Sequence, residues 1–470
     1  IDPTPFFTGN LISTIGSDNT STSGIAIGFP VSSNILWKIG EIPISSNFLV
    51  RLSAQTHKQD GFRTNSYSGS DSTNMKNEYF YRAKVHWLAN ENLTVKYMHF
   101  NTEMNNNYDV WSPDNNTDYL TYSDRQGKDS LATTSNSLTI DFNANKKTGL
   151  QGYYQYTNSM HDIVYSYDGD WGNNEMWLNN YGFDPSIEGY TYDFFDETIR
   201  KRESRSHELR VNNIQNTIIA GLYQSYLDEA DNASGWLFGG NASSVLSNYN
   251  ISNKALYGQI KLFNNMNTNV VVNLRYEKHN TDYCSSSNNY GADLPSIKKT
   301  ITHSHLGFKI ALLHKLNEQS SLYLSGAQGF KAGGVNQNPY LSAGSRFYEP
   351  EYNVNFEGGY TATSNSHRAS VNAFYMIRNN QHVQISSQQD PGDPNSFYYF
   401  TANAGNGVNY GLEFDSKIKL TPSLSIKSSL GILFTNVDKY TFDSGSENIS
   451  LGDREQAMSP TYNFNLGIDY

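Results

Sequence analysis

Two pairs of side chains in this sequence have the spacing of metal ligands, but neither pair is complete. His303 and His305 would lie on one face of an extended strand, and two imidazoles in that position could hold a metal ion. No acidic residue or cysteine lies near them in sequence to complete a metal site. Two solvated histidines that face a water-filled interior, or lumen, are therefore the preferred interpretation. Asp168 and Asp170 are spaced like the first ligands of a calcium loop, but the twelfth position is Asn179. The sequence therefore predicts no metal site and no cofactor, with a loose calcium contact on a loop as the alternative.

A glycine-rich stretch, SLYLSGAQGFKAGGVN at 321–336, has the composition of a phosphate-binding loop. Such a loop must lead into a helix, because the helix N-terminus holds the phosphate. The residues that follow include Pro339 and Gly344, which argue against a helix. We instead predict a strand that leaves its sheet into a loop, with Lys331 facing solvent or a ligand.

Aromatic residues concentrate after residue 164 in a long polar segment that also contains the two aspartates. Trp171 and Trp177 are rigid, amphipathic side chains that could stack on a flat ligand such as a chelator ring or a sugar. A loop that packs on itself is the alternative. The predicted ligand-contacting residues are Tyr165, Asp168, Asp170, Trp171, Trp177, Lys331 and Asn336.

Several function classes find no support in the composition. The net charge is -11 and the basic residues are scattered, which argues against nucleic-acid binding. No Ser-His-Asp pattern or paired carboxylates suggest an enzyme. The single cysteine, Cys284, lies in a stretch that reads as a loop. Aromatic residues make up 14% of the chain, which a disordered chain would lack, so we expect a folded β protein.

Period-two alternation is the dominant pattern of the chain. In residues 270–277, Val270, Val272, Leu274 and Tyr276 fall on one face, and the opposite face carries Arg275 and Glu277. Similar runs occur at 48–54, 79–87 and 424–434. One apolar face and one charged face, over long runs, are typical of strands that cross a bilayer. The polar faces of these runs and of their neighbours are expected to carry Arg51, Arg82, Arg210, Arg275, His303 and His305.

Short and long connections alternate between these runs. Short turns are expected at 88–93, 212–217 and 314–320, and long polar loops at 166–200, 229–250 and 278–300, among others. This asymmetry is typical of a transmembrane barrel. We therefore predict an all-β, antiparallel, up-and-down transmembrane β-barrel of about 17–18 strands. A soluble β core is the alternative, although the second face is too charged to form a core layer.

The C-terminal half carries motifs that identify a family. FYEPEYNVNFEGGYTA at 347–362 resembles the Pro-Glu…Glu-x-Gly-Tyr signature of TonB-dependent outer-membrane receptors, with Pro350, Glu351, Glu357, Gly359 and Tyr360 at the signature positions. Residues 402–426 resemble a second family pattern and residues 329–336 resemble a third. Residues 51–65 resemble the third barrel strand of the family. The resemblance covers most of the chain, with the pieces in the family's order.

The resemblance implies an outer-membrane receptor that binds a scarce ligand, most often a ferric siderophore, on its outer loops. The implied partners are that ligand, the TonB energy-coupling complex, and membrane lipid and lipopolysaccharide. A family barrel has 22 strands around an N-terminal plug. Residues 1–470 would then be a partial barrel domain that lacks the plug and the last strands. The arginines and histidines of the polar face would face the plug.

A passive porin is the second hypothesis. The ending YNFNLGIDY alternates and closes on an aromatic residue, as many outer-membrane proteins do. The chain would then be a complete barrel of about 18 strands, and its inward arginines would line a water channel and tune ion selectivity.

Overall fold

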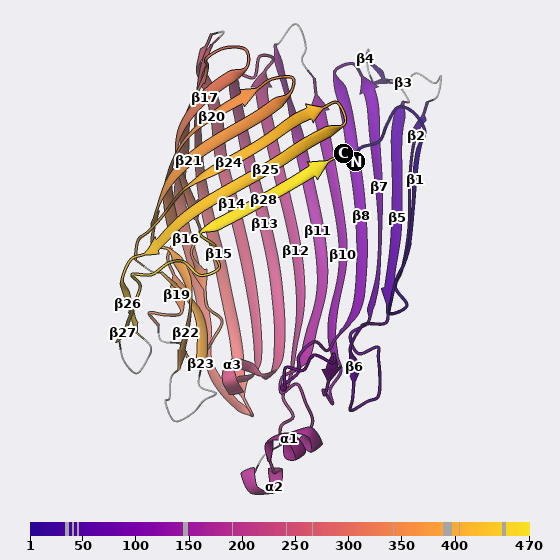
Figure 1. The fold of residues 1–470 in the computed structure, drawn as a ribbon, viewed down its shortest axis with the longest axis vertical. Coiled ribbons are helices and arrows are strands. Elements are labelled where there is room, and N and C mark those ends of the chain that lie inside the picture. The colour runs from indigo at the N-terminus through magenta and orange to yellow at the C-terminus, as the bar shows by residue number, and fades with distance from the viewer. Residues whose placement is uncertain are drawn as a thin grey trace. The chain divides into compact units, whose positions relative to one another are not determined.

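The computed structural model describes residues 1–32, 37–39, 42–44, 47–143, 149–189, 191–240, 242–265, 267–341, 343–388, 397–403, 405–443 and 448–470. Within these residues, 18 strands belong to one large sheet. The fold expected from the period-two alternation, antiparallel and up-and-down, is confirmed (Figure 1). No helix among the described residues is long and apolar enough to cross a membrane.

The described chain divides into two compact units, which we treat separately. Unit 1 consists of Ile1–Arg210, Tyr223–Ser252 and Thr281–Thr300, and unit 2 of Val211–Leu222, Asn253–Asn280 and Ile301–Tyr470.

Unit 1 contains seven complete sheet strands, and each pairs antiparallel with the next. The longest ladder joins β8 and β10, from Leu93↔Phe142 to Tyr108↔Gly127. The strands are β1 (Thr8–Ile15), β2 (Ser21–Val31), β5 (Phe48–Gln59), β7 (Lys76–Asn90), β8 (Leu93–Tyr108), β10 (Gly127–Phe142) and β11 (Leu150–Asp168). Residues 51–59 thus lie in the third strand, as the resemblance implied.

Unit 2 holds six complete sheet strands, and β17 pairs on its other side with the end of β16. They are β17 (Ser320–Lys331), β20 (Glu351–Thr363), β21 (His367–Asn379), β24 (Gly407–Thr421), β25 (Leu424–Val437) and β28 (Tyr462–Asp469). Short two-stranded ribbons lie in the connections of the chain: β3 (Trp37–Ile39) with β4 (Ile42–Ile44), β6 (Thr64–Asn65) with β9 (Leu120–Thr121), β18 (Gly334–Val335) with β19 (Phe347–Tyr348), β22 (His382–Gln388) with β23 (Phe397–Asn403), and β26 (Tyr440–Asp443) with β27 (Asn448–Leu451).

Five long strands contribute residues to both units, and they correct two sequence-based expectations. They are β12 (Phe195–Asn213), β13 (Ile218–Trp236), β14 (Ala242–Asn264), β15 (Thr268–Asn289) and β16 (Ala292–Lys315). Residues 229–250 and 278–300 were expected to be long loops, and this is wrong, because strand covers most of both. Cys284 accordingly lies in a strand.

The connection between β15 and β16 shows why the second of these loops is absent. It consists of Tyr290 and Gly291, whose φ angles of 46° and 99° are both positive. Two residues with positive φ form the tight turn that joins the two strands of a hairpin. The polar residues on either side of this turn therefore continue the ladder.

The two faces of β15 reverse the usual burial rule. Leu274 is 54% exposed and Tyr276 is exposed as well, whereas the polar face carries the half-buried Arg275 and the buried His279. A soluble protein would bury the leucine and expose the arginine. The exposed apolar face is therefore suited to contact with lipid, as the alternation predicted.

Aromatic side chains mark both ends of the apolar face on β7. Trp87 stacks on Phe48 beside the short turn after β7, with ring centroids 6.1 Å apart. Tyr79 and Tyr81 are exposed on the same face towards the other end. The distance along the strand from Trp87 to Tyr79 is about 26 Å at roughly 3.3 Å per residue. Because barrel strands tilt by roughly 35–45°, this distance along the strand covers about 20 Å of an apolar band that is about 25 Å tall.

A charge placed on the apolar face should be far more costly than one on the polar face. We expect Leu274→Lys to lower the free energy of unfolding by about 2–4 kcal/mol, because the ammonium group would enter hydrocarbon. Asn273→Lys, one residue away on the polar face, should change it by less than about 1 kcal/mol. Urea unfolding of the protein in lipid vesicles measures both. Equal losses in the two variants would contradict the assignment of the faces.

Candidate functional site

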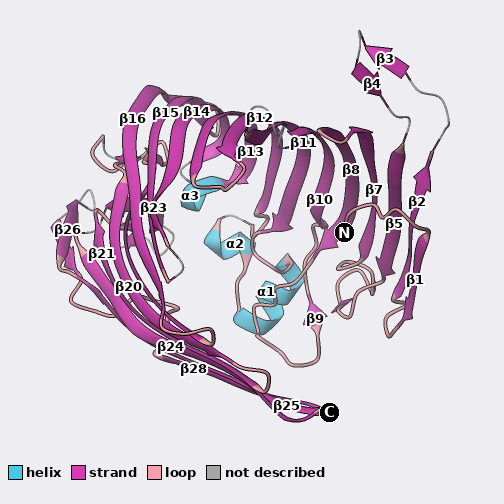
Figure 2. Ribbon diagram, turned by 90° about the horizontal axis from the view of Figure 1, so that it is seen from above, coloured by secondary structure: helices cyan, strands magenta, loops and turns pink. Residues whose placement is uncertain are grey.

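The connection after β11 in unit 1 folds into two short helices. α1 (Asn174–Tyr181) begins at Asn173, whose side-chain oxygen accepts a hydrogen bond from the Met176 amide at 2.9 Å. It ends at Gly182, whose φ of 71° suits a glycine C-cap. α2 (Pro185–Glu188) follows, capped by Asp184. Both helices lie beyond the strand ends, on one side of the unit 1 sheet (Figures 1 and 2).

Asp170 organises this connection. One of its oxygens accepts hydrogen bonds from the Gly172 amide at 3.1 Å and from the Trp177 indole at 3.2 Å. The other oxygen accepts one from the Phe194 amide at 3.1 Å. The side chain is 6% exposed. These bonds join the start of the connection, helix α1 and the entry to β12, so Asp170 fixes the shape of the loop.

Asp168 and Asp124 lie beside Asp170, and we call these three residues the carboxylate cluster. Asp168 is 4% exposed and accepts hydrogen bonds from the amides of Asp124 at 3.1 Å and Asp170 at 3.3 Å. Asp124 lies on the connection between β9 and β10, and its amide also bonds the carbonyl of Gly172 at 3.0 Å. The cluster therefore joins two connections that are distant in sequence.

The crowding of carboxyl groups changes their acidity. Burial, with the nearby charges of Asp170 and Asp124, raises the pKa of Asp168 to about 8. Burial also raises the pKa of Asp124, with contributions from Asp170 and Asp193. The charge of Arg125 opposes this effect on the pKa of Asp124, and the Arg125 guanidinium bonds Asp193 at 3.0 Å and covers the ring of Phe195.

Two exposed indoles, one of them the next residue after Asp170, are stacked on each other. Trp111 and Trp171 have ring centroids 5.8 Å apart and an interplanar angle of 27°. They are 52% and 39% exposed. We call them the tryptophan pair. Tyr108 accepts a hydrogen bond from the Trp111 indole at 3.2 Å and packs edge-on against Tyr165, with centroids 5.1 Å apart.

Trp177 has a different environment from Trp171. Its ring packs on Tyr181 and Tyr192 at 4.9 and 5.0 Å, and its indole nitrogen bonds Asp170. The interpretation that this loop packs on itself therefore describes Trp177, whereas Trp171 presents its ring to the outside.

Asp109 fixes the connection that carries Trp111. Its buried carboxylate accepts hydrogen bonds from the side chains of Asn65 at 3.0 Å, Thr121 at 2.7 Å and Ser123 at 3.1 Å. Asn65 belongs to the connection between β5 and β7. Three connections of unit 1 are therefore held by buried carboxylates, and the tryptophan pair rests on a rigid base.

Unit 2 contains the other two predicted ligand contacts, Lys331 and Asn336. Lys331 is exposed at the end of β17. Asn336 is buried, and its side chain forms two hydrogen bonds with the backbone of Thr401, at 2.7 and 2.9 Å. Asn336 therefore ties one connection of unit 2 to another.

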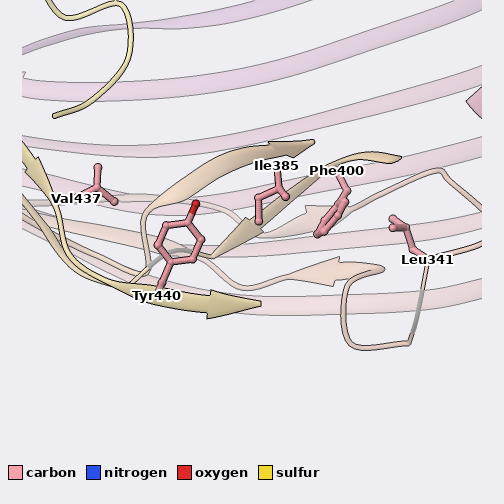
Figure 3. Packing of buried hydrophobic residues seen from close by; sticks show 5 residues of the cluster. All are labelled: Leu341, Ile385, Phe400, Val437 and Tyr440. Carbon is pink, nitrogen blue, oxygen red and sulfur yellow. The ribbon is translucent and has the colours of Figure 1, made fainter. Parts of the chain in front are cut away.

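The connections of unit 2 pack around a small apolar core (Figure 3). Its buried members are Leu341, Ile385, Phe400, Val437 and Tyr440. Leu341 lies in the segment after β18, Ile385 and Phe400 in the β22–β23 ribbon, Val437 at the end of β25 and Tyr440 at the start of β26. We call these connections the unit 2 loop layer. An ion pair supports the layer: Glu351 accepts hydrogen bonds from Arg378 at 2.6 and 2.8 Å and from the His382 amide at 2.8 Å.

The glycines after β17 permit close packing within this layer. A Cβ atom on Gly333 would lie 2.3 Å from the Tyr348 carbonyl oxygen, and one on Gly334 would lie 2.3 Å from the Tyr348 hydroxyl. The stretch leaves the sheet at Lys331 and pairs again through β18, with no helix in described residues 332–341. The prediction of a strand that leaves its sheet is confirmed.

The predicted polar-face arginines lie opposite exposed apolar residues. Arg51 is buried and its Nη1 lies 3.5 Å from the Thr8 hydroxyl. Arg275 donates to Glu277 at 2.9 Å. Arg82 and Arg210 are half-buried and alternate with the exposed residues of β7 and β12.

The two predicted histidines lie in different surroundings. His305 is fully buried and stacks on Phe330 with centroids 4.3 Å apart. His303 lies with its Nε2 3.4 Å from a Glu349 carboxylate oxygen. In the described part of the chain, no three His, Cys, Asp or Glu side chains are arranged to hold a metal ion.

Two residues of this site escaped the sequence analysis. Trp111 lies in a polar stretch, YDVWSPDNN, where a lone tryptophan was a visible but unused signal. Asp124 has no local signal, because its partners Asp168 and Asp170 are over 40 residues away.

Comparisons with known proteins were made for the sequence and for the fold. A family model described as TonB dependent receptor-like, beta-barrel matches residues 51–470. No curated protein matches the sequence.

Solved structures share the fold at low sequence identity. The ferric yersiniabactin uptake receptor of Yersinia pestis aligns with a TM-score of 0.77 at 13% identity, over 100% of this chain and 66% of that chain. The siderophore receptor PiuA of Acinetobacter baumannii gives 0.68 at 13%, over 99% and 69%. The copper transporter OprC gives 0.69 at 11%, over 99% and 66%. The chain thus spans about two thirds of the length of these structures.

The buried Glu351–Arg378 ion pair of unit 2 should stabilise the protein far more than an exposed ion pair does. We expect Glu351→Gln to destabilise the unit 2 loop layer by about 2–3 kcal/mol, because Arg378 would lose its charged partner. Limited proteolysis should then cut between residues 381 and 403. Lys427→Ala removes an exposed pair with Asp469 and should leave the protease resistance unchanged, because solvent screens that pair. Equal protease resistance of the Glu351→Gln variant and the unmodified protein would contradict the role of this pair.

Proposed function

The chain belongs to the TonB-dependent receptor β-barrel family, and from this we propose that it is an outer-membrane receptor for a metal chelate that carries aromatic rings, such as a ferric siderophore. Energy delivered through TonB would drive import of the chelate. The reaction changes no covalent bond, so the protein acts as a transporter and not as an enzyme.

The observation that carries this proposal is the tryptophan pair. Exposed stacked indoles are costly to leave in water, and they offer a rigid flat surface to another ring. Catechol and phenolate rings, which many iron chelators contain, have the matching shape. The pair lies on long connections at one end of the unit 1 strands, which in a receptor barrel is the side from which ligand arrives.

The remaining predicted contacts divide into two roles. Tyr165 supports the Trp111 side of the site through Tyr108 and is exposed enough to touch a ligand. Asp168, Asp170 and Trp177 are assigned to positioning, because hydrogen bonds and ring contacts within the loop occupy them. In unit 2, Lys331 is proposed as a ligand contact and Asn336 as a support of the loop layer.

The passive porin remains the second candidate function. The loops of a porin need only filter solutes, whereas the loops of a receptor must hold a ligand. The exposed tryptophan pair, held in place by buried carboxylates, therefore favours the receptor over the porin. The polar-face arginines Arg51, Arg82, Arg210 and Arg275 are proposed to meet acidic residues of a plug. The apolar face would contact membrane lipid, with lipopolysaccharide at its outer edge.

Removing either indole should weaken chelate binding. With ferric tris(2,3-dihydroxybenzoate) as the probe, we expect Trp111→Ala and Trp171→Ala each to raise the Kd about 3- to 10-fold, since a ring contact is worth about 0.5–1.5 kcal/mol. Isothermal titration calorimetry on the protein in detergent micelles measures the constants.

The matched control is Tyr399→Ala, which removes an exposed aromatic ring from β23 of unit 2. Its Kd should equal that of the unmodified protein. If the unmodified protein gives no saturable heat, or if all three variants lose the same affinity, an aromatic chelate is not the ligand of this site.

A further inference from the structure

The carboxylate cluster does more than complete the loop fold, because its member Asp170 immediately precedes Trp171, whose indole is exposed. Trp171 lies between Asp170 and Gly172, and a hydrogen bond from the Gly172 amide to the Asp170 carboxylate closes the chain around it. Trp171 has a φ of 60°, a left-handed conformation that a non-glycine residue keeps only when its surroundings enforce it. The bonds made by Asp170 therefore hold Trp171 in a position that it would not adopt freely.

The charged groups that face Asp168 are mostly of one sign. Asp170 lies two residues further along, on the connection that begins where β11 ends at Asp168, and Asp124 comes from the connection before β10. Asp193, before β12, adds a third negative neighbour next to Asp124. Arg125 is the nearby cation, but its guanidinium is bonded to Asp193 and lies over Phe195. Asp168 thus has no cation of its own among these groups.

We infer that the carboxylate cluster positions Trp171 against Trp111 only while Asp168 carries a proton, so that the loop holds an aromatic ligand at neutral pH and releases it in alkali. This inference rests on the proposed function for its ligand. The rearrangement of the tryptophan pair follows from the geometry alone. Asp168, Asp124 and Asp170 are positioning residues in this account, because none of them touches the ligand.

The direction of the pH effect follows from the acidity of Asp168. Burial beside Asp170 and Asp124 raises its pKa from the ordinary 3.8 to about 8. A group whose pKa is raised by folding favours the folded loop at low pH. That stability is complete below about 3.8 and is lost as the pH rises through about 8. Above that pH, an ionised Asp168 repels Asp170, and the bonds that hold Trp171 weaken.

The tryptophan pair provides its own signal for the test. Stacked indoles give an exciton couplet in circular dichroism, which Trp111→Phe should abolish and thereby assign. In the full-length protein, the couplet should lose most of its amplitude between about pH 7 and about pH 9. Asp168→Asn, which mimics the protonated carboxyl, should keep the full amplitude throughout. An unchanged couplet in the unmodified protein over this range, or the same loss in Asp168→Asn, would overturn the inference.

A second variant keeps the test decisive if Asp168→Asn does not fold. Asp124→Asn removes one of the like charges, so the midpoint of the transition should move down by about 1 pH unit. Asp118→Asn removes an exposed carboxylate from the preceding connection and should leave the midpoint unchanged. A midpoint that is the same in Asp124→Asn and in the unmodified protein would contradict the role of the cluster.

Binding of ferric tris(2,3-dihydroxybenzoate), measured on the same samples, separates this inference from the proposed function. Affinity should fall at least about 3-fold as the couplet disappears. A probe that fails to bind even at about pH 6.5, where the couplet is complete, would refute the proposed ligand and leave the positioning role standing. A Kd that stays constant while the couplet is lost would refute the control of binding by pH.

Discussion

The structure depends on the satisfaction of backbone hydrogen bonds in a place where water is absent. Where the apolar side chains of a strand face hydrocarbon, no water can hydrogen-bond its backbone amides. Each amide must therefore form its hydrogen bond with a neighbouring strand. The ladders of units 1 and 2 meet this requirement, with long continuous registers such as that between β8 and β10. The polar side chains are thereby confined to the opposite face, where Arg275 finds Glu277 and Arg200 finds Asp231. An apolar core inside the sheet is unnecessary.

The connections follow the opposite rule. They stand in water and have few apolar residues to bury, so polar contacts fix their shape in unit 1. Asp109 and Asp170 each accept hydrogen bonds from separate segments and add to the ring contacts of Trp177 with Tyr181 and Tyr192. In unit 2 a small apolar core around Phe400 fixes the shape of the connections instead. Because a buried carboxylate is sensitive to its own ionisation, the solution used in unit 1 also makes the tryptophan pair responsive to pH.

Much of the sheet could be predicted from the sequence, because hydropathy alternates wherever one face meets lipid. This signal located the first half of β15 and the polar side of Arg275. It fails beyond Tyr276, where Lys278, Asn280 and Asp282 take the place of apolar residues and the strand continues with two polar faces. The site was only partly predictable. Trp171 and Asp170 were visible as a local pattern, whereas Trp111 and Asp124 join them through contacts that a single sequence does not encode locally.

The central claim is that alternate residues of one strand face lipid and an aqueous interior. Spin labels placed one at a time at residues 270–277 of β15, in the Cys284→Ser background, test it directly in reconstituted bilayers. Collisions with oxygen should dominate at 270, 272, 274 and 276, and collisions with a water-soluble nickel complex should dominate at 271, 273, 275 and 277. A profile without this alternation, or one with its phase reversed, would contradict the account.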